Sequence, residues 1–176
     1  MISEVVKTEN NYETAFRALQ SQRLAPGATW VERLRETAMD RFVQMGFPSV
    51  AEEEWKYTNV APIGRIDFRP ATSNGSVLFD VGQLEQFSYV EAKESRLVFV
   101  NGVPRPDLSS LSGLPDGFVA IDLAAALQSE HYGLVAQEYL ARVVECGENG
   151  FTALNTALIS HGAFVLIPNI QRLSLH

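Results

Sequence analysis

The chain has 176 residues, of which 46% are hydrophobic and 20% charged, as expected for a globular protein with a core of its own. Its net charge of −7 and its scattered arginines argue against a basic face that would bind nucleic acid or an anionic membrane. Cys146 is the single cysteine, so no intrachain disulfide can form, and no apolar run approaches the length of a membrane span. The first residues do not resemble a secretory signal. We therefore expect a cytoplasmic protein, or an organellar one if a transit peptide is removed.

Two helices are predicted in the first quarter of the chain. Tyr12, Phe16 and Leu19 recur at helical spacing and predict a helix over about residues 11–23, which ends before Pro26. The second helix is expected over about residues 30–45, followed by Gly46 as its left-handed terminal residue. Thr29 and Glu32 have the spacing of a capping box at its start. Its apolar stripe comprises Val31, Leu34, Ala38, Phe42 and Met45.

The middle of the chain predicts short elements joined by turns. Ser49 and Glu52 suggest another capping box and a helical turn that ends near Trp55. Irregular chain is expected over about residues 61–74, and a strand over about 76–81. A short buried strand over about residues 97–100 is followed by Asn101-Gly102, a strong turn signal, and then by prolines that exclude the middle of a sheet.

The last third predicts alternating short strands and helices. A strand is expected over about residues 118–121, and a helix over about 131–145, with Asp122 or Ser129 able to begin helical turns. Phe151, Leu154 and Leu158 define another helix, which we expect to end at Gly162. Residues 163–167 are almost wholly apolar, which is typical of a strand buried on both faces. Because few residues follow it, the chain looks truncated there.

The residue chemistry predicts no catalytic or metal site. Three consecutive glutamates, Glu52 to Glu54, point in different directions on a helix, so a solvated first turn is the favoured interpretation. Lys56 beside them is expected to be charged and paired. Cys146 has neither a second cysteine nor a histidine at metal-ligand spacing, and no phosphate-binding or nucleophile-elbow motif is present. Trp55 and Tyr57 either anchor a loop to the helices, which we favour, or stack on a partner.

Four segments in the same order resemble the amino-terminal part of the SufD proteins, within the SufB/SufD family of scaffold subunits for iron–sulfur cluster assembly. The most specific is the block EEWKYTN, which favours SufD over SufB. The others are the VFVNG strand, a Leu-Ser-Ser-Leu segment and the LNTA helix. The signature residues, expected to be structural, are Glu53, Glu54, Trp55, Lys56, Tyr57, Thr58, Asn101, Gly102, Leu154 and Asn155.

The resemblance implies a fold and a role. It implies an α+β, mostly helical amino-terminal domain with a small sheet over 1–160, and the first strand of a truncated right-handed parallel β-helix over 161–176. The implied role is non-catalytic scaffolding in the SUF system beside SufB-like subunits and a SufC-like ATPase. The iron–sulfur cluster would be handled by the full complex, and no cofactor is expected on this chain. The alternative is a free-standing protein-interaction module that uses the Trp55 and Tyr57 region.

Overall fold

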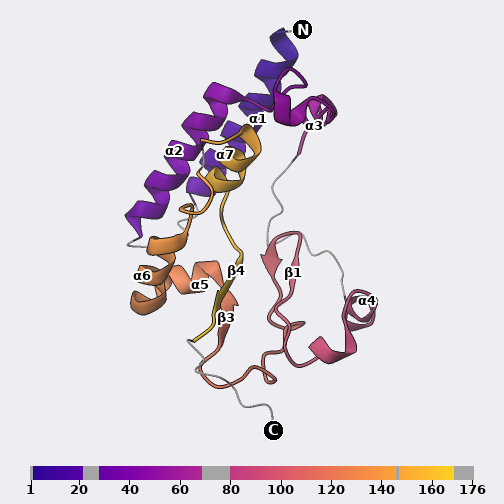
Figure 1. Ribbon diagram of the computed structural model, residues 1–176, viewed down its shortest axis with the longest axis vertical. Helices are drawn as coiled ribbons and strands as arrows, with labels where there is room; N and C mark the ends of the chain where they lie inside the picture. Colours follow the sequence, from indigo (N-terminus) through magenta and orange to yellow (C-terminus); the bar gives the residue numbers. More distant parts are fainter. Residues whose placement is uncertain (1, 22–27, 69–79, 146, 169–176) are drawn as a thin grey trace. The chain divides into compact units, whose positions relative to one another are not determined.

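The computed structural model describes residues 2–21, 28–68, 80–145 and 147–168, with side chains described from residue 11 onward. These residues form a mostly helical protein with two small antiparallel sheets of two strands each (Figure 1). The chain divides into two compact units. Unit 1 comprises Met1–Pro70 and Leu127–Ser160, and unit 2 comprises Ala71–Ala126 and His161–His176. The predicted mixture of many helices and little sheet is confirmed, whereas no β-helix coil is present in the described ranges.

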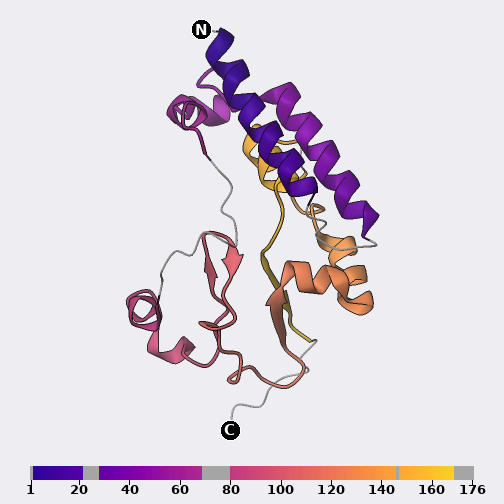
Figure 2. The same ribbon diagram turned by 180° about the vertical axis from the view of Figure 1, so that it is seen from behind.

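Unit 1 is helical. In Figures 1 and 2, three of its helices, α1, α2 and α7, lie side by side. The elements of unit 1 are α1 (Ile2–Gln20), α2 (Thr29–Met45), the 3₁₀ turn η1 (Glu53–Trp55), α3 (Ala61–Gly64), α6 (Glu130–Tyr139) and α7 (Gly150–Ala157).

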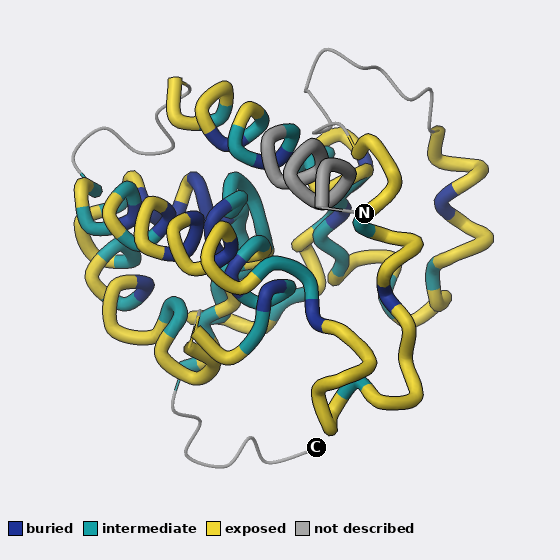
Figure 3. The backbone as a smooth tube through the Cα atoms, turned by 90° about the horizontal axis from the view of Figure 1, so that it is seen from above, coloured by how far each residue is buried: buried dark blue, intermediate teal, exposed yellow. Residues whose placement is uncertain are grey.

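The core of unit 1 lies where α1, α2 and α7 meet. Phe42 of α2 is completely buried, and its ring contacts the Tyr12 ring edge-on with 5.5 Å between centroids. Figure 3 shows buried positions alternating with exposed ones along the helices, as amphipathic helices require. The buried members of this cluster are Tyr12, Phe16, Ala38, Met39, Phe42, Ala153 and Ala157. Burial of these apolar side chains holds the helices together.

The second predicted helix is confirmed as α2, but its predicted capping box is wrong. Thr29 is already the first helical residue, and the residue before it is Ala28, whose side chain makes no capping bond. The Val31 amide instead donates to the Ala28 carbonyl oxygen at 3.0 Å. At the other end Gly46 has a φ of 64°, and its amide donates to the Phe42 carbonyl oxygen, as the glycine predicted.

Some other elements begin or end at residues different from those predicted. Helix α1 begins earlier than predicted, and α6 ends at Tyr139 rather than near residue 145. Residues 61–64 form the short helix α3 instead of irregular chain, because a proline in the first turn loses no helical hydrogen bond. The strand predicted over 76–81 falls mostly outside the described residues, and its last residue, Val81, begins helix α4.

Unit 2 is built from hairpins and short helices. Its elements are α4 (Val81–Glu85), the 3₁₀ turn η2 (Val90–Ala92), β1 (Phe99–Val100), β2 (Val103–Pro104), β3 (Val119–Asp122) and β4 (Ala163–Leu166); α5 (Leu123–Gln128) follows β3 directly. A small apolar cluster contains Leu84, Val98 and Leu108, with Val100 packed against it.

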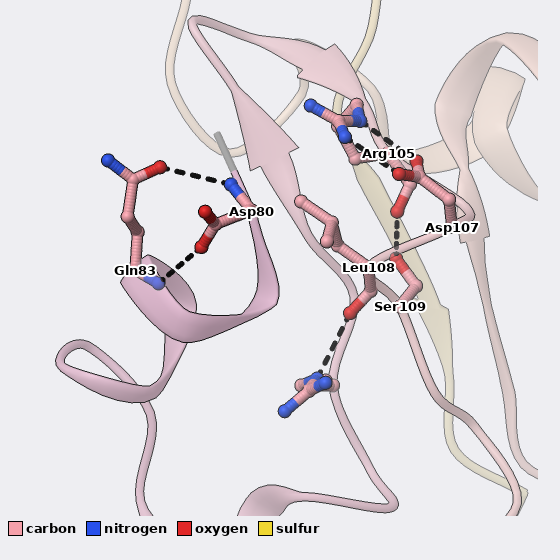
Figure 4. A network of polar contacts seen from close by, with 7 residues as sticks. Asp80, Gln83, Arg105, Asp107, Leu108 and Ser109 are labelled. Atoms are coloured by element: carbon pink, nitrogen blue, oxygen red, sulfur yellow. Dashed lines mark hydrogen bonds and ion pairs between the residues drawn. The ribbon is translucent and has the colours of Figure 1, made fainter. Parts of the chain in front are cut away.

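Polar contacts fix the irregular chain around that cluster (Figure 4). Asp80 and Gln83 form a complete capping box at the start of α4, with bonds of 2.9 and 3.0 Å. The Ser109 hydroxyl accepts from the Val98 amide at 2.9 Å and donates to the Arg105 carbonyl oxygen at 2.9 Å. Hydrogen bonds from the Arg105 guanidinium, at 2.8 and 2.7 Å, lower the pKa of the Asp107 carboxyl.

Strand β4 differs from its prediction in two ways. It pairs antiparallel with β3, with Val119 opposite Leu166 and Asp122 opposite Ala163. Its side chains are alternately exposed and half-buried, so it is not buried on both faces. Val165 of β4 is 58% exposed, and Ile167, which directly follows the strand, is 61% exposed. The apolar residues of this segment therefore favour a strand, but the described residues do not cover both of its faces.

Candidate protein-interaction surface

The EEWKYTN block lies on a compact turn that its own backbone stabilises. The Ser49 amide donates to Glu52 Oε1 at 2.7 Å, which is one of the two bonds of the predicted capping box. The second bond differs, because the Ser49 hydroxyl accepts from the Ala51 amide at 3.3 Å. Two further backbone bonds, from Trp55 to Glu52 at 3.0 Å and from Thr58 to Trp55 at 2.8 Å, close the turn. The segment is thus a fixed turn rather than an open loop.

Trp55 anchors this turn to the helical core. Its ring lies 5.4 Å from the Phe151 ring of α7, measured between centroids. Phe151 in turn lies 5.1 Å from Phe47, and Phe47 lies 5.2 Å from Phe42. A chain of aromatic contacts therefore leads from the turn into the centre of unit 1. Such pairs add roughly 0.5–1.5 kcal/mol each beyond the burial of their surface.

The neighbours of Trp55 in the block point into solvent. The side chain of Glu53 is 89% exposed, and that of Lys56 is 51% exposed. Tyr57 is 93% exposed, the highest exposure among the large hydrophobic residues described. Lys56 Nζ lies 3.7 Å from Glu53 Oε1 and 5.7 Å from the centre of the Tyr57 ring. The expected pairing of Lys56 with a glutamate is therefore present. The favoured expectation that Trp55 and Tyr57 both anchor a loop to the helices holds for half-buried Trp55 but is wrong for Tyr57, whose side chain lies in solvent.

The remaining signature residues lie in a turn and a helix. Asn101 and Gly102 have φ values of 50° and 79° and connect β1 to β2, which is the left-handed turn that this dipeptide predicts. In α7, Leu154 packs against the core of unit 1, whereas Asn155 is exposed. Thr58 is exposed beside Tyr57. The signature residues thus do not converge on one pocket.

Sequence reasoning missed a buried arginine in α2. Arg35 is only 2% exposed; its Nε donates to the Ala157 carbonyl oxygen at the end of α7, at 3.2 Å. Its Cζ lies 5.9 Å from the centre of the Phe16 ring of α1. Burial lowers the pKa of Arg35, and the Glu32 charge opposes that change. Its spacing of four from Val31, a member of the apolar stripe, is the signal that could have found it.

A second polar pair that sequence reasoning missed joins β3 to β4. The Asp122 carboxylate lies 2.9 Å from His161 Nδ1 and accepts from the Gly162 amide at 3.2 Å. The Leu123 amide also donates to the Gly162 carbonyl oxygen at 2.7 Å. Asp122 thereby ties the end of one strand to the start of the next. Both residues predicted to begin helical turns directly precede helices. Helix α5 starts right after Asp122, and Ser129 caps α6 by accepting from the Tyr132 amide at 3.3 Å.

The structure does not test the metal or thiol hypothesis for Cys146 directly. Among the residues that the structure describes, no three histidine, cysteine, aspartate or glutamate side chains gather as a metal site would require. Cys146, the residue on which that hypothesis depended, lies outside the described residues. Within the same ranges, no helix combines the length and apolar character that a membrane crossing demands. The feature that stands out is therefore the exposed aromatic and charged turn around Tyr57.

Comparison with known proteins identifies relatives along almost the entire chain. The SufBD protein N-terminal region family matches residues 6–174. An iron–sulfur cluster assembly SufBD family protein of Synechocystis is 33% identical over 172 residues, which is 96% of this chain and 36% of that protein. The iron–sulfur cluster assembly protein SufD of Bacillus subtilis is 28% identical over 148 residues, or 81% of this chain and 32% of that protein.

A further SufBD family protein of Synechocystis is 49% identical over 53 residues, covering 30% of this chain and 11% of that protein. No solved structure gives a significant match. The chain spans about a third of the length of the Synechocystis relative matched over 172 residues and of the Bacillus subtilis SufD protein. Because the family model matches residues 6–174, nearly the whole chain, the chain belongs to the SufBD N-terminal region family.

Proposed function

We propose that this chain is a non-catalytic scaffold domain of the SUF system, which assembles iron–sulfur clusters in the cytoplasm. The observation that carries the proposal is the family match over residues 6–174, together with relatives named as iron–sulfur cluster assembly proteins. The positions of the signature residues support a structural role: Trp55 and Leu154 pack on the core, and Asn101 occupies a turn.

The proposed partners are a SufB-like subunit and a SufC-like ATPase, with the cluster as cargo of the complete complex and no cofactor resident on this chain. We further propose that residues 161–176 begin a parallel β-helix. The exposed side chains of Val165 and Ile167 support this, because they leave a strand face that stacked coils would bury. The observed pairing of β4 with β3 occupies only one edge of β4 among the described residues.

Co-purification from the native cell tests the proposed partners. An affinity tag is added to the chromosomal gene, and proteins that are recovered with the tagged product are quantified against a cell that carries the tag alone. We expect the SufB-like and SufC-like proteins to be recovered in comparable molar amounts with the tagged protein. Recovery of neither subunit, with the tagged protein folded and monomeric, would contradict the scaffold role.

That contrary result would favour the second candidate, an independent protein-interaction module. One observation favours this candidate specifically: Tyr57 is 93% exposed on a turn that Trp55 fixes to the core. Tyrosine is enriched in protein–protein interfaces relative to the rest of the protein surface.

A further inference from the structure

The dipeptide Asn-Gly occurs at two described places that differ in their surroundings. Asn101 and Gly102 form the turn between β1 and β2, and both residues are exposed. Asn149 and Gly150 lie at the start of α7, where Asn149 is half-buried and Gly150 is buried. In this dipeptide an asparagine side chain reacts readily with the main chain that follows it, because glycine has no side chain to obstruct the attack. The same latent chemistry is therefore present in two different environments.

The reaction is an intramolecular deamidation. The main-chain nitrogen of the glycine attacks the carboxamide carbon Cγ of the asparagine, and a nitrogen–carbon bond forms. The carboxamide nitrogen takes the proton of the attacking nitrogen and leaves as ammonia. Water then opens the resulting succinimide at either carbonyl carbon, which yields aspartate or isoaspartate. No atom is oxidised or reduced, and water is the only co-reactant.

The environment of Asn101 allows this reaction. A Cβ built on Gly102 would meet nothing within 4 Å, so the turn lies in open space. Asn101 and Gly102 have φ values of 50° and 79°, and the peptide group between them must rotate out of this left-handed turn before the attack. Strands β1 and β2 have two residues each, and a two-stranded hairpin is only marginally stable. Opening of the turn therefore costs little free energy.

The environment of Asn149 opposes the same reaction. Its carboxamide oxygen accepts from the Thr152 amide at 3.0 Å, which fixes the side chain as the cap of α7. Its carbonyl oxygen accepts from the Ala153 amide at 3.0 Å, so the helix also holds the peptide group that leads to Gly150. A Cβ on Gly150 would overlap the Gly46 carbonyl oxygen, because the end of α2 lies directly against it. Attack would require α7 to lose its cap and to leave the end of α2.

We propose that Asn101 is a site of spontaneous deamidation in the folded protein, that its product opens the β1–β2 turn, and that the fold protects Asn149. Isoaspartate carries the main chain through its Cβ, and the extra carbon disrupts the short turn that aligns Val100 with Val103. Either product adds a carboxylate to a chain whose net charge is already −7. Val100 packs against the apolar cluster of unit 2, so the change should loosen that cluster. The order of unit 2 then falls with the age of each molecule.

Peptide mass spectrometry of ageing protein compares the two rates. The folded chain is kept in mildly alkaline buffer, and samples are digested with pepsin in acid, where deamidation is slow. The mass change from replacement of a carboxamide by a carboxylate is quantified for each peptide. We expect Asn101 to react at least about tenfold faster than Asn149, which must first lose its helix cap and its packing. Residues 74–75, a third Asn-Gly pair, lie outside the described residues, and their peptide is quantified separately.

The same chain in concentrated guanidinium chloride is the matched control, because unfolding removes the turn, the cap and the packing together. There the rates at Asn101 and Asn149 should become similar. Equal rates in the folded chain, or a faster reaction at Asn149, would overturn the proposal. So would an Asn101 that stays intact in the folded chain for as long as the unfolded chain needs to react.

Amide hydrogen exchange tests the consequence for the turn. The deamidated fraction is separated from the intact chain by anion exchange, through its added negative charge, and identified by its Asn101 peptide. Peptides from residues 98–105 should exchange faster in that fraction, and peptides from α2 should exchange as in the intact chain. Equal exchange of residues 98–105 in the two fractions would contradict the opening of the turn. Both experiments use the purified chain alone, so their outcome is independent of the proposed scaffold role.

Discussion

Single residues in unit 1 differ sharply in how much they contribute to the fold. Phe42 is completely buried and touches rings from α1 and from the turn before η1, whereas Tyr57 lies almost wholly in water. Both are aromatic, and the apolar stripe of α2 distinguishes Phe42 in the sequence. Nothing comparable marks Tyr57, because its exposure depends on how Trp55 orients the turn.

Phe42→Ala should destabilise the protein by about 3–5 kcal/mol, because it removes a fully buried ring and leaves a cavity between three helices. The free energy of unfolding from urea titration, followed by far-ultraviolet circular dichroism, measures the change. Tyr57→Ala serves as the control and should alter that free energy by less than about 0.5 kcal/mol. A loss below about 1 kcal/mol for Phe42→Ala would contradict the core described above.

Gly150, at the start of α7, lies so close to the backbone of Gly46 that a side chain would not fit there. A Cβ added there would overlap the Gly46 carbonyl oxygen and lie 2.8 Å from the Gly46 carbonyl carbon. The absence of a side chain therefore lets α7 begin directly against the end of α2. Sequence reasoning did not find this contact, because close approach between distant segments leaves no local pattern.

Gly150→Ala should destabilise unit 1 by about 1–3 kcal/mol through overpacking, although alanine ordinarily favours a helix over glycine. Gly147→Ala is the matched control, since a Cβ at Gly147 meets nothing within 4 Å. Thermal unfolding of the two variants and the wild type measures the difference. Equal melting temperatures for Gly150→Ala and Gly147→Ala would show that α7 does not begin against Gly46.

At the scale of elements, the sequence predicts α2, the β1–β2 turn and the apolar face of α7 well. Each has a local cause: a helical apolar stripe, an Asn-Gly dipeptide and the spacing of Leu154 from Phe151. The environment of β4 was predicted wrongly, because an apolar run does not reveal whether one face or both are covered. Arg35 was missed because its partners, Phe16 and Ala157, come from α1 and α7.

The packing of α1 should weaken in alkaline solution. Burial and the nearby Asp67 charge raise the pKa of Tyr12 above its ordinary value of 10.0. The stability that the neutral phenol contributes is fully present below pH 10, the unfolded value, and is lost as the pH rises through the higher folded pKa.

Urea titration of the wild type from pH 8 to pH 11 should therefore show a falling free energy of unfolding above about pH 10. Tyr12→Phe removes the ionisable hydroxyl while keeping the ring. Its curve should fall less steeply over the same interval. If the free energies of unfolding of the two proteins fell in parallel with pH, the burial of Tyr12 of α1 against α2 would be contradicted.

At the scale of the whole molecule, the family match and the resemblance in sequence agree. The EEWKYTN block, the turn at Asn101 and the Leu154 helix lie within the matched residues 6–174. The exposure of Tyr57 could not be predicted from the EEWKYTN block alone, because neighbouring residues in the block have different environments. Trp55 packs on Phe151, and Tyr57, two residues later, remains in solvent. Only the three-dimensional structure of the turn shows that Trp55 packs on the core and that Tyr57 does not.

The most direct measurement of the central claim, a scaffold role in iron–sulfur cluster assembly, is the activity of an iron–sulfur enzyme such as aconitase in cells that lack this gene. The account predicts reduced activity at an unchanged amount of aconitase protein, restored by the wild-type gene and by Tyr89→Ala. Restoration by Phe42→Ala should be poor, because that variant unfolds unit 1 more readily. Full aconitase activity in the deletion strain, with no second SufD-like gene expressed, would contradict the claim.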